Sequence, residues 1–346
     1  MPIASTGTAP RPQASPSRAR DATASADADA SGHPGAVTSV ARATAPLGSL
    51  AGRAVLLATD DSAGAEAGAR VALALAAKYR AIIHVINVVD TRSAPMPAPL
   101  DLALAMGDAV IGPGVHAERI EEIRAALSTV TGQPITWPVH VTLGNPASSI
   151  AKEARRIDAA LIVIGLRRHG GVERLVHDET ALNVMRNAAC PVLAVVPGTT
   201  GLPTRVLAAV DFSRSSLLAV RTARAVVGDD AVLVLAYAPP LPGRLPDDGE
   251  SVIHDLGIEA GFANIARELG DEGLTFDHVV LHHELPRTPA EMILEYADVA
   301  TTDLIAAGSA RHGRLERWMV GSVSTDLVRD GRHSLLVVPP RHEGQH

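Results

Sequence analysis

The residues that could do chemistry in this chain stand at the ends of apolar segments, most clearly in its second half. Gly308 ends one such segment, and Gly321 and Ser322 precede a later segment with helical spacing. Glycine lets a backbone approach an anion closely, and the N–H groups at a helix N-terminus supply donors and a partial positive charge. Asp211 ends another apolar segment. Together these residues predict an anion-binding site with one carboxylate beside it.

Simpler interpretations of the same residues stand beside this one. Asp211, and Asp60 at the equivalent place in the first half, would cap the turn or helix that follows, as short acidic side chains often do. Ser62, Ser213 and Ser322 are expected to be helix-start residues rather than nucleophiles, because no set of serine, histidine and acid is organised around them.

The elements that must position these residues occur twice. Residues 164–174 and 307–317 have nearly the same sequence, with Arg-His-Gly at the same place in each. An offset of 143 continues through the following residues and pairs Leu193 with Leu336, whereas near the front of each copy the offset is 151. The chain therefore holds two copies of one domain, and the second copy has lost eight residues in the middle.

Length and composition give the same domain count. A chain of 346 residues is longer than one hydrophobic core usually serves. Residues 1–50 are mostly Ala, Ser, Thr, Pro and Gly with almost no large apolar side chains, which predicts a disordered tail. We expect the first domain over 51–198 and the second over 199–341, with a linker at 198–203.

Each domain alternates short, continuously apolar segments with segments of helical spacing. In the first domain we expect strands at 54–59, 81–89, 135–142, 160–164 and 191–196, and helices at 63–79, 116–131, after Pro146 and at 179–188. In the second domain we expect strands at 204–210, 231–236, 276–282, 303–307 and 334–338. This alternation predicts an α/β fold in which a parallel sheet is covered on both faces.

Composition excludes several classes of function. A net charge of −7 gives no reason to expect binding to DNA or to an anionic membrane, although it leaves local basic patches open. A content of 2% aromatic residues argues against a stacking platform for single-stranded nucleic acid. The single Cys190 excludes an internal disulfide and is expected to be a small buried residue. His282 and His283 would point to opposite faces of a strand, so no metal site is expected. Without a bilayer-spanning segment or a signal peptide, we expect a soluble, cytoplasmic protein with no membrane partner.

The chain resembles the universal stress protein family in a tandem form, over about residues 52–340. The resemblance rests on the order and spacing of motifs in both copies. These are Ala58-Thr59-Asp60-Asp61-Ser62, Gly144-Asn145-Pro146-Ala147, Arg168-His169-Gly170-Gly171 and Cys190-Pro191-Val192-Leu193, then Ala209-Val210-Asp211-Phe212-Ser213, Arg311-His312-Gly313 and Gly321-Ser322-Val323-Ser324. The resemblance implies two doubly wound, five-stranded parallel sheets of order 3-2-1-4-5, similar to adenine nucleotide alpha hydrolases. It also implies that the last strands, at 192–196 and 335–338, pair the two domains as an internal pseudo-dimer, and it leaves a homodimer open.

Many members of that family bind ATP through a glycine-rich loop, so the resemblance implies an adenine nucleotide in the second domain. The implied contacts are Asp211, Ser213, Gly308, Arg311, His312, Gly313, Gly321, Ser322 and Val323. Arg311 stands where the family has glycine, and its side chain would either clash with a phosphate or grip it. His312 would donate to phosphate or simply be solvated. Whether Mg²⁺ accompanies the nucleotide is left open, because a metal held by phosphate oxygens leaves little trace in the sequence.

The first copy departs further from the family pattern. Arg168 again replaces a glycine, and Asp178 and Glu179 replace the final glycine and hydroxyl residue. Two carboxylates at the phosphate position would repel a triphosphate and would themselves satisfy the start of the helix. Arg168 would then pair with one of them. We therefore expect the first domain not to bind ATP.

The resemblance implies a stress-response regulatory module rather than an enzyme, in which nucleotide bound to the second domain changes the docking of an unknown protein partner. One alternative is an interaction scaffold of the same fold that binds no nucleotide. Another is a weak ATP hydrolase, for which Asp211 is the only residue that could act as a base.

Overall fold

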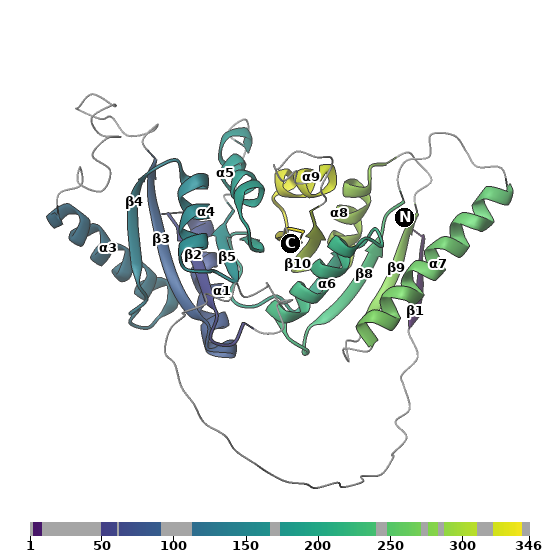
Figure 1. Cartoon of the computed structure of the whole chain (residues 1–346), viewed down its shortest axis with the longest axis horizontal. Helices are drawn as coiled ribbons and strands as arrows, with labels where there is room; N and C mark the ends of the chain where they lie inside the picture. The colour runs from purple at the N-terminus through teal and green to yellow at the C-terminus, as the bar shows by residue number, and fades with distance from the viewer. Residues whose placement is uncertain are drawn as a thin grey trace, which may run out of the picture.

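The computed structural model describes residues 3–8, 50–60, 62–90, 113–166, 174–239, 248–270, 276–282, 287–309 and 321–340. Within these residues the strands form one continuous sheet, of order β1-β9-β8-β7-β10-β11-β6-β5-β2-β3-β4, with helices on both of its faces (Figure 1). In each half the five strands of the repeat lie in the order 3-2-1-4-5, which confirms the predicted fold class.

The helices and strands follow one another in the same order in both halves, as the sequence repeat predicts. The first half holds β2 (Ala54–Thr59), α1 (Ala63–Tyr79), β3 (Ile82–Asp90), α3 (Pro113–Thr131), β4 (Val139–Gly144), α4 (Pro146–Arg156), β5 (Leu161–Gly165), α5 (Arg174–Asn187) and β6 (Val192–Val195). The second half holds β7 (Arg205–Ala209), α6 (Arg214–Val227), β8 (Val232–Tyr237), α7 (Asp248–Gly270), β9 (Asp277–His282), α8 (Pro289–Val299), β10 (Leu304–Gly308), α9 (Ser322–Asp330) and β11 (Ser334–Val338).

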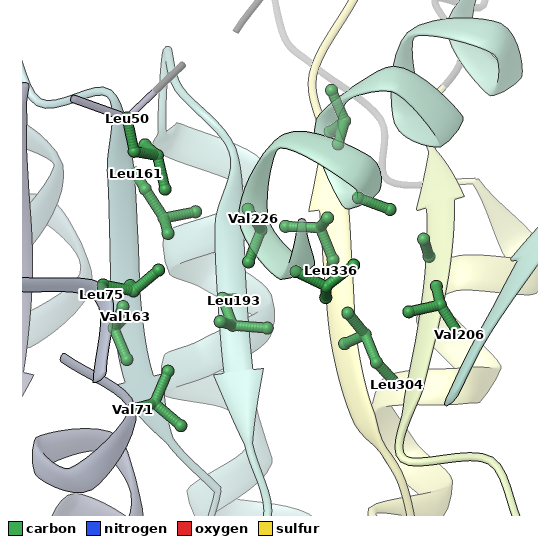
Figure 2. Packing of buried hydrophobic residues seen from close by; sticks show 14 of the residues in the cluster. Leu50, Val71, Leu75, Leu161, Val163, Leu193, Val206, Val226, Leu304 and Leu336 are labelled. Carbon is green, nitrogen blue, oxygen red and sulfur yellow. The ribbon is translucent and has the colours of Figure 1, made fainter. Parts of the chain in front are cut away.

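The two halves join through their last strands. β6 and β11 pair antiparallel, whereas the five repeat strands within each half pair parallel. Leu193 lies opposite Leu336 in this ladder, and both side chains are fully buried (Figure 2). The predicted internal pairing of the two domains is thus confirmed, and it makes a single sheet of the two halves.

The hydrophobic core lies in two layers, one on each face of the sheet. α1, α3, α6 and α7 supply the helical side of one layer, which contains Leu75, Val226 and Leu269. α4, α5, α8 and α9 supply the other, which contains Ile150, Met185 and Leu327. Each layer runs through both domains without a break, because β6 and β11 carry apolar side chains on both faces. Burial of this kind, at about 25 cal/mol per Å² of apolar surface, is what holds the halves together.

Local sequence explains where the helices begin. Ser62 caps α1 by accepting a hydrogen bond from the N–H of Ala65. Asn145 caps α4 in the same way, with Pro146 as the first helical residue. Thr288 and Glu291 form a reciprocal capping box at the start of α8. Each of these caps satisfies N–H groups that a helix start would otherwise leave unpaired.

Three elements differ from the sequence-based expectation: β4 and α5 begin at other residues, and β1 is an additional strand. β4 begins at Val139 rather than at residue 135, because Pro138 has no N–H to give to the ladder. α5 begins at Arg174 rather than near residue 179. Residues 3–8, expected to belong to a disordered tail, instead form β1 (Ile3–Thr8), which pairs antiparallel with β9 at the edge of the second half.

Candidate functional site

The two aspartates that follow the first strand of each half stand in closely matched turns. The Oδ1 of Asp60 accepts a hydrogen bond from the N–H of Ser62 at 3.0 Å, and the Oδ1 of Asp211 accepts one from the N–H of Ser213 at 3.0 Å. Each serine in turn caps the following helix. Turn formation by the aspartates and capping by Ser62 and Ser213 are therefore what the structure shows for these four residues, as the simpler interpretation predicted.

Asp211 remains ionised in this turn at ordinary pH. Burial by itself would raise its pKa, but hydrogen bonds from the side chain and backbone of Ser213 and from Ser216 outweigh that effect and hold the pKa below its ordinary value. The residue after it, Phe212, takes a positive φ of 61°, which completes the turn. A carboxylate is thus fixed at the carboxyl end of β7, at the edge where ligands bind in sheets of this kind.

Gly308 and its equivalent Gly165 have a packing role. A Cβ built on Gly308 would lie 2.4 Å from the carbonyl oxygen of Ser215, and one on Gly165 would lie 2.1 Å from the carbonyl carbon of Gly64. The carboxyl ends of β10 and β5 therefore touch the first turn of α6 and α1, backbone against backbone. Glycine is required there by close packing, whether or not a ligand is bound.

The start of α9 is the clearest anion-binding feature among the described residues. Gly321 is the N-cap residue, with φ −57° and no side-chain capping hydrogen bond, and Ser322 is the first helical residue. The first bond of the helix runs from the N–H of Thr325 to the carbonyl of Gly321. The N–H groups of Ser322, Val323 and Ser324 precede it and have no partner within the helix, as at any helix start. Free N–H groups at a helix start, with the positive end of the helix dipole, are donors of the kind that an anion accepts from.

Arg311, His312 and Gly313 lie outside the described residues, and so do Arg168 and His169 of the first half. Of the nine residues predicted to contact a nucleotide, the structure describes six. It places Asp211, Ser213 and Gly308 at the carboxyl ends of β7 and β10, and Gly321, Ser322 and Val323 at the start of α9.

The two halves differ most at this helix start. The repeat makes Glu179 the equivalent of Ser322, yet α5 begins at Arg174, five residues earlier. At 1.5 Å per residue, α5 therefore extends about 7.5 Å beyond the position at which α9 begins. Asp178 and Glu179 were expected to satisfy the helix start, and this is corrected: both lie inside α5, past its first turn. The segment from Leu175 to Glu179 contains no glycine or proline that would delay the helix.

A cavity of about 420 Å³ opens at the carboxyl edge of the first half, beside the point where the strand order reverses. The ends of β2, β3 and β5 form its floor, and α4 and α5 form its walls. The lining residues are Ala58, Thr59, Asp60, Ile86, Val88, Asp90, Pro146, Ile150, Ile164, Gly165, Leu166, Thr180 and Ala181. Sequence reasoning found only Asp60 among the polar ones. Asp90 had a detectable signal, because it ends the strand next to β2, but Thr180 stands in a helix without any distinguishing motif.

The second half carries an aromatic cluster that sequence reasoning also missed. Phe212 stacks on Tyr237 with ring centroids 4.8 Å apart, and meets Phe262 of α7 edge-on at 5.1 Å. Gly261 makes room for this, because a Cβ there would lie 2.6 Å from the Phe212 ring. The rings join the core layer of α6 and α7. They anchor α7 and lie on the face of the sheet away from α8 and α9.

Three further features of the described residues concern metal binding, membrane insertion and the state of the Cys190 thiol. No group of three or more His, Cys, Asp or Glu is placed to hold a metal ion within the described ranges. No helix in the part of the chain that the structure describes is long and apolar enough to cross a membrane. Cys190, expected to be buried, is partly buried at the edge of the core layer of α4 and α5. Burial raises its pKa to about 12, which keeps the thiol protonated at ordinary pH.

Comparison with known proteins gives a consistent result. The family described as "Universal stress protein family" matches residues 52–196 and again residues 203–339. A universal stress protein of Mycolicibacterium smegmatis is 25% identical over 296 residues, which cover 83% of this chain and 97% of that protein. A universal stress protein of Thermus aquaticus is 32% identical over 143 residues, 41% of this chain and 98% of the relative.

A solved structure that aligns with most of this chain has the same fold. The crystal structure of a universal stress protein from Archaeoglobus fulgidus superposes with a TM-score of 0.55 at 20% identity, covering 83% of this chain and 98% of that one. At 20% identity this similarity is evidence for the fold alone. The evidence for an evolutionary relationship is the family match over both halves.

Proposed function

This chain belongs to the universal stress protein family, with two such domains in tandem, and from that premise we propose that it is a regulatory module that binds an adenine nucleotide, ATP or a close relative, in its second domain. The observation that carries the proposal is the start of α9. Its N-cap is a glycine without a side-chain cap, so the N–H groups of its first turn are available to phosphate oxygens.

The groups around that helix start fit the same ligand. Asp211 holds an ionised carboxylate at the end of β7, where it would accept hydrogen bonds from a ribose or base. Gly308 brings the end of β10 into backbone contact with the start of α6, beside Asp211. Mg²⁺ would be held chiefly by the phosphate oxygens, because among the described residues no cluster of ligands offers it a site.

Regulation would follow from the position of α9 at the junction of the domains. α9 packs against α5 of the first half, next to the β6–β11 ladder. A nucleotide on the N-terminus of α9 would favour one arrangement of this helix and the loop before it. Because α9 and α5 touch, the change would reach the surface of both domains and alter the docking of a protein partner.

Calorimetry on the full chain tests the proposal with ATP and ADP in the presence of Mg²⁺. We expect about one site per chain from a single retained helix start. Gly321→Val should abolish binding by covering the N–H groups. Its fold should survive, because φ at Gly321 is −57° and no described atom lies within 4 Å of a Cβ there.

The matched control is Asp178→Ala, at the equivalent place in the first half, which should leave ATP binding intact. The opposite pattern of the two variants contradicts the assignment to the second domain. Absence of binding at millimolar nucleotide, with both proteins folded, would favour a scaffold that recognises partners without nucleotide. Release of phosphate that is lost in Asp211→Asn would instead favour the weak hydrolase.

A further inference from the structure

Among the described residues, β4 ends the sheet and pairs with β3 alone, so its outer edge is open. From its backbone geometry and from its counterpart β9, we propose that β4 pairs antiparallel with β4 of a second copy of this chain, about a two-fold axis. This pairing joins two sheets edge to edge, as β6 and β11 join the two halves within one chain. The contact involves neither α9 nor Asp211, so it is independent of nucleotide binding.

The parallel ladder between β3 and β4 decides which backbone groups of β4 face outward. The N–H of Val85 donates to the carbonyl of Pro138 at 2.8 Å, and Val85 is the ladder partner of Val139. In a parallel ladder, the bonds from β3 then continue to the even-numbered residues of β4. Val139, Val141 and Leu143 therefore direct their N–H and C=O groups away from β3, toward the open edge. Backbone groups in this position are a template for a further strand.

The second half shows that this kind of edge accepts an added strand. β9 is the counterpart of β4, and residues 278–281 (His-Val-Val-Leu) match residues 140–143 (His-Val-Thr-Leu). β1 pairs antiparallel with β9 over all six residues of β1. α7, the counterpart of α3, does not prevent this pairing (Figure 1). An antiparallel strand beside β4 is therefore compatible with the helices of the repeat.

The sequence of β4 lacks the features by which edge strands usually avoid pairing. Residues 139–144 contain no proline and no Lys, Arg, Asp or Glu. Val139 and Leu143 are apolar and only partly buried, so an added strand removes more of their surface from water. Trp137, just before the strand, is also partly buried, and tryptophan is enriched at protein interfaces. The edge therefore suits a strand of another protein chain.

A second copy fits this edge because the strand is complementary to itself. When Val141 faces Val141 of the second copy, Val139 faces Leu143 and His140 faces Thr142. Apolar side chains then meet apolar ones, and no like charges lie opposite each other. Each outward residue exchanges both of its backbone hydrogen bonds with the residue opposite, as the hydrogen-bonded pairs of an antiparallel ladder do.

The other end of the sheet limits the assembly to two chains. β1 covers β9 there, so within the part of the chain that the structure describes, β4 is the edge left open. One self-complementary edge closes about a two-fold axis and leaves no edge for a third chain. The expected assembly is a dimer whose sheet runs through both chains.

Two double substitutions that differ at one residue test this pairing in the full chain. In V139K with L143K, lysines face each other at both ends of the contact, and the dimer should weaken at least about tenfold. In V139E with L143K, opposite charges meet at the same places, and the dimer should be retained. Sedimentation velocity from about 1 to 100 μM measures the association, and thermal unfolding verifies that both variants are folded.

Hydrogen exchange of the unaltered chain gives a second readout. The amides of Val139, Val141 and Leu143 should gain protection as the protein concentration rises, because they are bonded only in the dimer. The amides of His140 and Thr142 should be protected at every concentration, because they donate to β3. Protection of the first three amides that does not change with concentration, in a chain that dimerises, would place the contact elsewhere.

Removal of residues 2–8 separates the β4 edge from the β9 edge. Dimers, or larger assemblies through the bared β9, should persist, because β1 takes no part in the contact. A truncated chain that is monomeric would indicate exchange of β1 between copies and would overturn the inference. An unaltered chain that stays monomeric at about 100 μM also overturns it, and so do two folded double variants that associate equally.

Discussion

Leu193 and Leu336 are equivalent positions of the repeat, and they lie directly opposite each other across the β6–β11 ladder. Their neighbours follow the same rule, because Val192 pairs with Val337 and Ala194 pairs with Leu335. Exchange of the two halves maps this set of pairs onto itself. The pseudo-two-fold axis of the molecule therefore passes between Leu193 and Leu336 (Figure 2).

The first prediction concerns coupling across this axis. Leu193→Ala and Leu336→Ala should each lower the free energy of unfolding by roughly 2 to 5 kcal/mol, because both side chains are fully buried. The double variant should differ from the sum of the two by at least about 0.5 kcal/mol, since neighbours in one core are not additive. Urea denaturation of the four proteins measures this. Leu127 is the control, because it is buried on α3, which packs against α1 and β4 at the outer end of the first half: paired with Leu336→Ala, Leu127→Ala should add within about 0.5 kcal/mol.

The second prediction separates a glycine needed for packing from one needed for a ligand. Gly308→Ala should lower the free energy of unfolding by roughly 1 to 3 kcal/mol, because the new Cβ would lie 2.4 Å from the carbonyl oxygen of Ser215. Gly321→Ala meets no described atom within 4 Å and should cost about 1 kcal/mol or less. Thermal unfolding of the two variants beside the unaltered chain provides the measurement. Equal losses would contradict the packing role of Gly308.

The third prediction is a dependence of stability on pH at Glu153. The hydrogen bonds from Arg156 hold the pKa of this buried carboxyl below its ordinary value of 4.5, although burial opposes them. A depressed native pKa means that the stabilisation is present above pH 4.5 and is lost as the pH falls through the native pKa.

Glu153→Gln should therefore lower the free energy of unfolding by about 1 kcal/mol at pH 7, a modest figure because Arg156 is largely exposed and solvent screens the pair. The difference should shrink toward zero in acid. Unfolding by urea at several pH values follows it, with Glu259→Gln on the exposed face of α7 as the control. A difference that is constant with pH would show that the charge of Glu153 is not the cause.

The fourth prediction concerns Asp211. Asp211→Asn keeps an oxygen that accepts from Ser213, so the turn should be preserved. The free energy of unfolding should fall by about 1 kcal/mol or less, because the lowered pKa of Asp211 means that its charge stabilises the fold. ATP binding in the second domain should weaken about tenfold or more, because an ionised acceptor is lost. Calorimetry measures the affinity, and thermal unfolding verifies the fold. Unchanged affinity would leave Asp211 with only the structural role that its turn already shows.

The fifth prediction concerns the reactivity of Cys190. A pKa raised from 9.0 to about 12 by burial reduces the thiolate fraction at pH 8 on the order of a thousandfold. Alkylation by iodoacetamide should therefore be far slower in the native chain than in urea. The ratio of the two rates, followed by mass spectrometry, is the readout. Fast native alkylation would mean that the residue is exposed and has no raised pKa.

The sequence by itself determined the domain count and the alternation of strands and helices. These properties depend on local patterns: apolar segments of strand length, capping residues such as Ser62 and Asn145, and a repeat that places Leu193 and Leu336 at equivalent positions. Each of them can be recognised within a short window, and the repeat shows the same window twice. The strand order came from the family resemblance, and the pairing of β6 with β11 agrees with it.

Only the tertiary structure decided how the residues of the candidate site pack. Gly308 was predicted as a ligand contact, but its requirement for glycine comes from Ser215, far away in sequence and brought close by the sheet. The start of α5 at Arg174 and the cavity beside Thr180 depend in the same way on which surfaces pack together. A linear pattern records which residues are apolar and which are charged. The space that is left between them, and the N–H groups that remain unbonded there, are fixed only when distant elements meet.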